Sequence, residues 1–153
     1  MEKQQIAQLY EAYATDVYRL ALSWLCSTHD AEDILQSVFL KLLDNKITIF
    51  PGKEKAWLLT CTANACKDHL RTFWHRNTQP LDDQIIAHTD EDHSLWEAVV
   101  RLKPTYRAVI HLYYYEGYPQ DEIAKILGIS RTAVQTRMQR AREILKKELN
   151  ING

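Results

Sequence analysis

Residues 120–142 read QDEIAKILGISRTAVQTRMQRAR, and their pattern indicates the fold of the C-terminal part of the chain. Its apolar spacing predicts a short helix at 120–127, a tight turn at 128–130 and a long final helix at about 131–149. Gly128 suits the left-handed end of the first helix, and Ser130 can cap the second. The residues expected to bury the helix crossing are Ile123, Ala124, Leu127, Ile129 and Val134. Two helices joined by a three-residue turn with glycine predict a helix-turn-helix unit, with an ordinary helical hairpin as the alternative.

The final helix and its approach carry an excess of positive charge. Residues 125–147 contain seven Lys or Arg and one acid, a net charge of +6. Such a stripe is what neutralisation of DNA phosphates requires. A recognition helix enters the major groove by its N-terminal end, so side chains there would meet base edges. The candidates for base readout are Arg131, Thr132, Gln135 and Thr136, and the candidates for phosphate contacts are Lys125, Arg137 and Arg140.

The formal net charge of −1 over 153 residues hides an uneven distribution. Residues 1–77 are neutral overall, residues 78–92 hold five acids and no Lys or Arg, and residues 93–153 have a net charge of +4. We therefore expect a neutral domain at 1–77, an acidic linker at 78–93 and a basic domain at 94–153.

Amphipathic helices are also expected in the N-terminal domain. The first has an apolar stripe from Ile6 to Trp24, and Thr28 or Asp30 can cap a second helix at about 31–45. A loop at 46–53 is favoured over a short strand by its Pro-Gly pair. A third helix is expected at about 54–76, with burial of Trp57, Leu58, Cys61, Ala65, Leu70 and Phe73. With helices also expected at about 94–102 and 105–115, the predicted fold is all-α, with two small helical domains.

The end of the third helix is polar and basic. Lys67, Arg71, His75 and Arg76 share one face, and Trp74 stands among them. Two interpretations explain this pattern equally well. One is a solvated helix end with favourably placed cations, and the other is a nucleic-acid patch with an aromatic ring for base stacking.

Composition argues against membrane and disulfide-rich proteins. No apolar run approaches the roughly 18 to 20 residues that a membrane span needs, and residues 1–5 lack the apolar core of a signal peptide. A cytoplasmic location is therefore expected. The cysteines Cys26, Cys61 and Cys66 lack the number and spacing of a disulfide framework or a zinc site, and we expect them to be buried or half-buried.

The histidines do not form a recognisable catalytic arrangement. His29 and Asp30 could be half of a metal phosphohydrolase site, but no His precedes position 29 to complete it. The other histidines lack ligand spacing. We therefore expect no enzyme activity, no metal or other cofactor, and no small-molecule substrate.

The C-terminal domain contains the motifs Leu102-x-Pro104-x-x-Arg107-x-Val109-x-x-Leu112, Tyr114-x-Glu116-Gly117, Glu122-Ile123-Ala124-x-x-Leu127-Gly128-Ile129-Ser130 and Val134-x-x-Arg137-x-x-Arg140-Ala141-Arg142-x-x-Leu145. Together they resemble region 4, the promoter-binding domain of bacterial sigma factors. The N-terminal domain contains Asp30-Ala31-Glu32-Asp33-x-x-Gln36-x-x-Phe39-x-x-Leu42, then Trp57-Leu58 and Asn64-x-x-x-Asp68-x-x-Arg71. These motifs resemble region 2. The resemblance covers about residues 6–149, and two such domains resemble the extracytoplasmic-function class (group IV) of the sigma-70 family.

The resemblance implies a transcription initiation factor that binds core RNA polymerase and directs it to specific promoters. It implies core-polymerase contacts by Asp33, Gln36 and Phe39. It implies contacts with minus-ten DNA by Asn64, Lys67, Arg71, Trp74, His75 and Arg76. The base and phosphate candidates of residues 125–140 would bind minus-thirty-five DNA. Similar proteins are usually held inactive by an anti-sigma partner, so the resemblance implies such a partner here.

The chain departs from the family pattern at several positions. Thr132-Ala133 stands where Gly-Thr is usual, which leaves the base preference open. Ser37 replaces a common Glu, and Pro119 replaces a usual Ser or Thr cap. Thr62-Ala63 replaces a common Ala-Arg pair, and the missing arginine suggests a weaker or different contact with open DNA.

A stand-alone helix-turn-helix regulator is the alternative function. It explains residues 105–149 and their basic helix. It gives no role to the acidic start of the second helix or to the Asn64–Arg71 segment.

Overall fold

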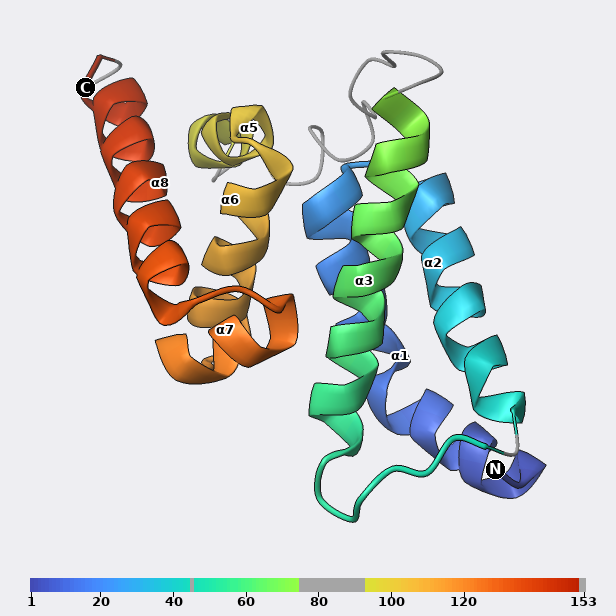
Figure 1. Cartoon of the computed structure of the whole chain (residues 1–153). Coiled ribbons are helices and arrows are strands. Elements are labelled where there is room, and N and C mark those ends of the chain that lie inside the picture. Colours follow the sequence, from blue (N-terminus) through green and yellow to red (C-terminus); the bar gives the residue numbers. More distant parts are fainter. Residues whose placement is uncertain (45, 75–92, 152–153) are drawn as a thin grey trace. The chain divides into compact units, whose positions relative to one another are not determined.

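The computed structural model describes residues 1–44, 46–74 and 93–151, and the regular elements within these ranges are all helical (Figure 1). The chain divides into two compact units, Met1–Thr78 and Gln79–Gly153. The prediction of an all-α fold with two helical domains is therefore confirmed. Apart from its last residue, the expected linker lies outside the described residues, so its bounds stay a prediction.

Three helices build the first unit: α1 (Lys3–Leu25), α2 (Thr28–Leu40) and α3 (Glu54–Trp74). A short 3-10 turn, η1 (Lys41–Leu43), continues α2. Each of the three helices packs against the other two. This packing removes their apolar stripes from contact with water, and that burial is the main contribution to the stability of such a bundle. The largest fully buried side chains between them are Val17, Leu20, Trp24, Val38, Leu42, Leu58 and Leu59.

Helix α2 begins three residues earlier than predicted, and its cap is neither Thr28 nor Asp30. Ser27 has an extended backbone (φ −145°, ψ 120°), and its Oγ accepts a hydrogen bond from the N–H of Asp30 at 3.2 Å. Cys26 takes a left-handed conformation (φ 51°) and donates its N–H to the carbonyl of Leu22, which closes α1. The break between α1 and α2 therefore consists of only Cys26 and Ser27.

Helix α2 also ends earlier than predicted, at Leu40 rather than near residue 45. The chain tightens into η1 and then extends at Asp44 (ψ 119°), whose Oδ1 accepts a hydrogen bond from the N–H of Lys46 at 2.9 Å. An aspartate that bonds the backbone two residues on favours a turn over a helix. Residues 46–53 contain no strand, so the predicted loop is confirmed.

The buried face of α3 differs from the predicted one. Of the expected residues only Leu58 is fully buried, whereas Trp57, Cys61, Ala65 and Leu70 are half-buried. The side chain of Phe73 lies outside the described part. The fully buried residues are Leu58, Leu59, Thr62, Ala63 and Cys66. Thr62 tolerates burial because its hydroxyl donates a hydrogen bond to the carbonyl of Leu58 at 2.7 Å.

The three cysteines are free thiols, and their predicted burial is confirmed: Cys26 and Cys66 are buried and Cys61 is half-buried. Burial raises the pKa of the Cys66 thiol well above its usual range. Burial also raises the pKa of Cys61, although the nearby Lys41 ammonium lowers it in part. Both side chains therefore stay neutral thiols at physiological pH. Within the described residues, no helix combines the length and the apolar character that crossing a membrane demands.

The second unit contains α5 (His93–Arg101), α6 (Pro104–Ile110), the π-helical turn η2 (His111–Tyr115), α7 (Gln120–Leu127) and α8 (Arg131–Ile151). Helix α8 packs against α5, α6 and α7, so it forms the spine of this unit. Leu102, Tyr106 and Ala141 form one buried cluster, with Ile110 and Leu145 packed against it.

The predicted helix-turn-helix unit is confirmed. Helix α7 spans the expected residues, and Gly128 ends it in a left-handed conformation (φ 67°). The Oγ of Ser130 accepts a hydrogen bond from the N–H of Ala133 at 3.0 Å and caps α8. Ala124 and Val134 are buried at the crossing, whereas Ile129 is half-buried.

Smaller differences concern the other helix bounds. Helix α5 begins and ends one residue before its predicted bounds, and α8 continues to Ile151. Pro104 occupies the first turn of α6, as predicted, because the missing N–H is not needed there. The predicted helix at 105–115 is present, but its last five residues form the π-helical turn η2. Arg107 is buried and donates hydrogen bonds to the carbonyls of Val100 (3.2 Å) and Leu102, so its charge is satisfied where α5 ends.

Burial makes a direct prediction about stability in the first unit. Leu20→Ala should lower the free energy of unfolding by about 2–5 kcal/mol, because it leaves a cavity at a fully buried position. Leu40→Ala, the same chemical change at a side chain that is 63% exposed, should change it by less than about 0.5 kcal/mol. Urea unfolding followed by circular dichroism measures both, and equal losses would contradict the described packing.

Candidate protein and nucleic-acid interfaces

The N-terminal half of α8 presents the predicted base-reading side chains at the surface. Arg131, Thr132 and Gln135 are exposed, and Thr136 is half-buried. Val134 and Met138, between and beyond them, are fully buried against the rest of the unit. The sequence therefore assigned the two faces of this helix correctly. The role of each exposed residue toward DNA remains a prediction.

Two of the predicted DNA-binding cations are paired with acids from the first turn of α7. The Nε of Arg131 lies 3.2 Å from Oδ1 of Asp121, and the Nζ of Lys125 lies 3.5 Å from Oε1 of Glu122. All four side chains are substantially exposed, so each pair contributes little to stability and can exchange for a phosphate.

Arg137 and Arg140 lie elsewhere on α8, along an open groove of about 460 Å³. The groove is also lined by Thr132 and Thr136 of α8 and by Lys103 and Thr105 at the start of α6. No ion pair involves Arg137 or Arg140 within the described part of the chain. Their charges are therefore available to an anion, and their contact with phosphates stays a prediction.

Arg142 belongs to the same basic helix but has a different arrangement. Its guanidinium carbon lies 5.6 Å from the ring centroid of Tyr113 and 5.7 Å from that of Tyr114. Its Nε also donates a hydrogen bond to the Tyr114 hydroxyl at 2.9 Å. Arg142 thus ties η2 to α8. Charge counting along the sequence does not distinguish this arginine from those available to DNA.

In the first unit, the residues predicted to contact the polymerase differ in accessibility. Asp33 is 59% exposed and Gln36 is exposed, both on the outer side of α2. Phe39 is only 6% exposed, and its ring meets Tyr10 of α1 edge-on, with centroids 5.0 Å apart. Phe39 therefore packs beneath this surface, and little of its ring is accessible to a partner.

An apolar hollow of about 350 Å³ lies beside these residues, between α1 and the end of α2. Tyr10, Leu40 and Leu43 stand around it with 47%, 63% and 50% of their surfaces exposed. Ile6, Gln36 and Phe39 complete its lining. Large exposed apolar side chains gathered in one place mark a protein interaction site more often than a solvated surface. No motif of the sequence singled out Tyr10, Leu40 or Leu43, because the hollow depends on how α1 packs beside α2.

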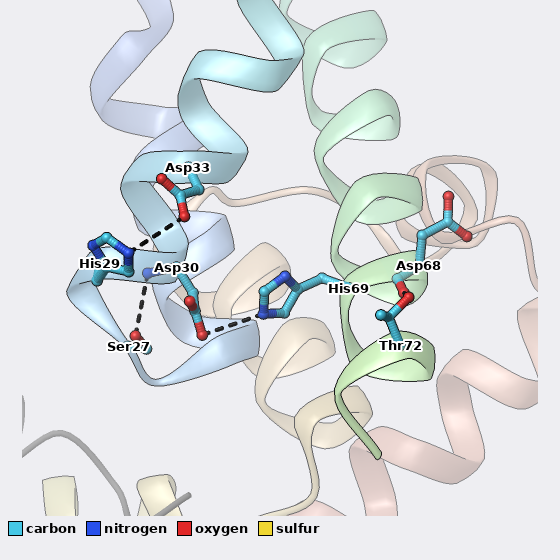
Figure 2. Close-up of polar contacts among 7 residues, drawn as sticks. All are labelled: Ser27, His29, Asp30, Asp33, Asp68, His69 and Thr72. Carbon is cyan, nitrogen blue, oxygen red and sulfur yellow. Dashed lines mark hydrogen bonds and ion pairs between the residues drawn. The ribbon is translucent and has the colours of Figure 1, made fainter. Parts of the chain in front are cut away.

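Polar contacts join the start of α2 to the last turns of α3 (Figure 2). Nε2 of His69 lies 3.2 Å from Oδ2 of Asp30, and both side chains are less than one-third exposed. Asp33 lies 3.6 Å from Nε2 of His29, one turn away on the same helix. The helix predicted to meet the polymerase is thus linked to the helix predicted to meet minus-ten DNA.

The described minus-ten candidates share one side of α3, since they are spaced by three and four residues. Asn64 and Arg71 are exposed, Lys67 is half-buried, and Arg71 pairs with Asp68 at 2.7 Å. The side chain of Trp74, together with His75 and Arg76, lies outside the described part. Ala63 is fully buried, so position 63 contributes to the helical core in this chain. The expected effect of the missing arginine on the contact with open DNA stays a prediction.

The described residues contain no group of three or more His, Cys, Asp or Glu side chains that could hold a metal ion. His29 and Asp30, considered above as half of a metal site, instead have separate partners: Asp33 for the histidine and His69 for the aspartate. Of these two pairs, Asp30 with His69 connects α2 to α3, and His29 with Asp33 lies within α2.

Comparison with known proteins matches both units to one family. Residues 9–76 match the model of Sigma-70 region 2, and residues 92–145 match that of Sigma-70 region 4. The RNA polymerase sigma factor SigV of Bacillus subtilis is 32% identical over 142 residues, which cover 88% of this chain and 84% of SigV. The ECF RNA polymerase sigma factor SigX of the same organism is 29% identical over 161 residues, covering 94% of this chain and 82% of SigX.

A solved structure shares the fold. The sigma factor RpoE of Bartonella quintana, crystallised with the anti-sigma factor NepR, superposes with a TM-score of 0.79 at 20% identity. The superposition covers 98% of this chain and 99% of RpoE. With the helix-turn-helix unit in place and both regions matched in order, the chain belongs to the sigma-70 family of RNA polymerase sigma factors and is a transcription initiation factor.

Proposed function

We propose that this chain is a sigma factor of the extracytoplasmic-function class (group IV), acting in the cytoplasm with core RNA polymerase at specific promoters. The observation that carries this proposal is the combination of two different surfaces. The second unit presents a recognition helix, and the first presents an apolar hollow with polar neighbours on α2. A stand-alone regulator needs only the recognition helix to bind DNA, so the apolar hollow of the first unit favours the sigma factor. Relatives named as ECF sigma factors support the class.

The proposed domains follow this division. Residues 1–77 bind core polymerase and minus-ten DNA, residues 78–93 link, and residues 94–153 bind minus-thirty-five DNA. The separation of the chain into two compact units near residue 78 supports the first boundary. Both proposed activities are binding, so they need no catalytic group, cofactor or small-molecule substrate.

The proposed core-polymerase interface consists of Asp33 and Gln36 with the apolar hollow beside them. An apolar centre with a polar rim is the usual anatomy of a protein interface. Exposed Leu40 and Leu43 supply the apolar surface, and Phe39 holds its base by packing against Tyr10.

The proposed DNA contacts divide between the two units. Asn64, Lys67, Arg71, Trp74, His75 and Arg76 bind the minus-ten strand. The exposure of Asn64 and Arg71 on one side of α3 supports this assignment. On the second unit, Lys125, Arg131, Thr132, Gln135, Thr136, Arg137 and Arg140 bind the minus-thirty-five element, and the exposed N-terminal face of α8 supports the readout of bases there.

An anti-sigma factor completes the proposed set of partners. The structural neighbours RpoE and CnrH were each solved with a regulatory partner, NepR for the first and the cytosolic domain of CnrY for the second. We propose that a protein of this kind holds the present chain inactive by covering the surfaces that polymerase and DNA require.

The first test is transcription from DNA. With core polymerase added, the full chain should start run-off transcripts at a defined site, and residues 93–153 alone should not, because they lack the proposed polymerase interface. Binding of an operator at nanomolar concentration by the chain alone, with no initiation after core polymerase is added, would establish the regulator instead.

The polymerase interface can be tested without DNA. The double variants Asp33→Asn/Gln36→Ala and Leu40→Ala/Leu43→Ala should each weaken core binding at least fivefold, as expected when buried interface side chains are truncated. Their unfolding midpoints and their binding to free DNA should not change, since these side chains are exposed. Ile144→Ala, at an exposed apolar side chain of the other unit, is the control for core binding. Unchanged core affinity in both double variants would exclude this surface.

The recognition helix predicts two different kinds of loss. Arg140→Ala should weaken binding to all sequences and lower the salt slope by about one, because it removes one phosphate contact. Gln135→Ala should relax preference at one or two base pairs at a cost of roughly 1–3 kcal/mol. Selection from a randomised DNA library with the holoenzyme, followed by affinity measurements, separates the two effects. An equal loss of affinity for all DNA sequences in Gln135→Ala would show that Gln135 does not face the bases and that α8 lies in the groove in another orientation.

A further inference from the structure

The groove beside the recognition helix brings together residues far apart in the sequence. Lys103 and Thr105 come from the start of α6, and Arg137 and Arg140 come from α8. Neither Lys103 nor Thr105 belongs to the helix-turn-helix unit, and neither was singled out by the sequence pattern. The groove measures about 460 Å³ and is open to solvent along its length.

The charges in this groove are all of one sign. Its cations are Lys103, Arg137 and Arg140, and no carboxylate is among its lining residues. Within the described ranges, none of these three cations forms an ion pair, whereas Arg131 and Lys125 outside the groove are paired with acids. The hydroxyls of Thr105, Thr132 and Thr136 add hydrogen-bond donors between the cations. Cations with hydroxyl donors are the chemistry that recognises a phosphate diester.

Lys103 is held where it can serve this purpose. Its backbone carbonyl accepts hydrogen bonds from the N–H groups of Tyr106 (2.9 Å) and Arg107 (3.0 Å), so its main chain is fixed at the start of α6. Its Nζ lies 5.8 Å from the ring centroid of Tyr106, which is 91% buried. This contact restrains the ammonium group near the groove while leaving the side chain exposed.

We propose that this groove clamps a phosphate of the DNA backbone, with Lys103 on one side and Arg137 and Arg140 on the other. Thr132 and Thr136 lie both in the groove and on the face of α8 proposed to read bases, so DNA seated on that face brings its backbone to the groove. The inference therefore rests on the proposed promoter binding. An open groove whose cations include the exposed Lys103 and Arg140 and the half-buried Arg137 fits a polymer backbone better than a free phosphate ion. Lys103 thus fixes the register of α8 on DNA without reading sequence.

The test measures binding of the full chain to a labelled 30-base-pair duplex of arbitrary sequence by fluorescence anisotropy, between 50 and 200 mM KCl. Lys103→Gln should reduce the slope of log affinity against log salt by about 0.9, equivalent to roughly an eightfold loss of affinity at 100 mM. Lys103→Arg should restore the slope, because the charge is kept. Lys53→Gln, the same change at an exposed lysine in the loop before α3, should leave the slope as it is.

Several results would overturn the clamp. An unchanged slope for Lys103→Gln, or an equal reduction for Lys53→Gln, would mean that Lys103 makes no specific contact. Displacement of the duplex by inorganic phosphate, beyond the effect of potassium chloride at the same ionic strength, would assign the groove to a free anion. Run-off transcription separates this failure from that of the proposed function. Initiation by the Lys103→Gln holoenzyme together with an unchanged slope rejects the clamp alone, whereas absence of initiation by the unsubstituted chain rejects the function.

Discussion

The same type of hydrogen bond, accepted by a serine Oγ from the N–H three residues later, caps the start of two of the helices proposed to meet a partner, α2 and α8. Ser27 caps α2 in this way, and Ser130 caps α8. Before each serine a left-handed residue ends the preceding helix, Cys26 (φ 51°) in one case and Gly128 (φ 67°) in the other. Glycine adopts this conformation without steric cost, whereas a cysteine costs on the order of 1 kcal/mol. Burial of the Cys26 side chain, which is 4% exposed, offsets that cost.

This difference explains which parts of the fold could be predicted. At 128–130 glycine and serine are the only residues suited to ending and starting a helix, and the predicted bounds of α7 are confirmed. At 26–30 the prediction considered only Thr28 and Asp30 as caps, and no glycine marks the end of α1, so the predicted cap lies after the actual one, Ser27. On α3 the buried face consists largely of small residues such as Ala63 and Cys66. A prediction from apolar spacing favours large side chains such as tryptophan and phenylalanine for burial, so it missed these small residues.

The candidate sites also combine features that the sequence predicts with features that depend on how the helices pack. Exposure of Arg131, Thr132 and Gln135 follows from helical periodicity alone, and the structure agrees. The pairing of Arg131 with Asp121 joins residues across the turn, and the hollow under Leu40 and Leu43 needs α1 beside α2. Both depend on how helices pack, and no local pattern records this. The sequence therefore predicts which face of α8 is exposed, but it does not show that Arg131 on this face is already paired with an acid.

The exposed ion pairs with α7 slightly reduce what the second unit alone gains when it binds DNA. When DNA binds, Arg131 exchanges its ion pair with Asp121 for a contact with a phosphate. The net free energy gained is the difference between two exposed ionic contacts, and this difference is small in water. Specific binding by a single small module is correspondingly weak, because it makes few contacts. A polymerase that holds both units on one promoter turns the second binding step into an intramolecular one, so two weak contacts act together. Selection of promoters is therefore expected of the holoenzyme more than of the second unit alone, because each contact of that unit with DNA is weak by itself.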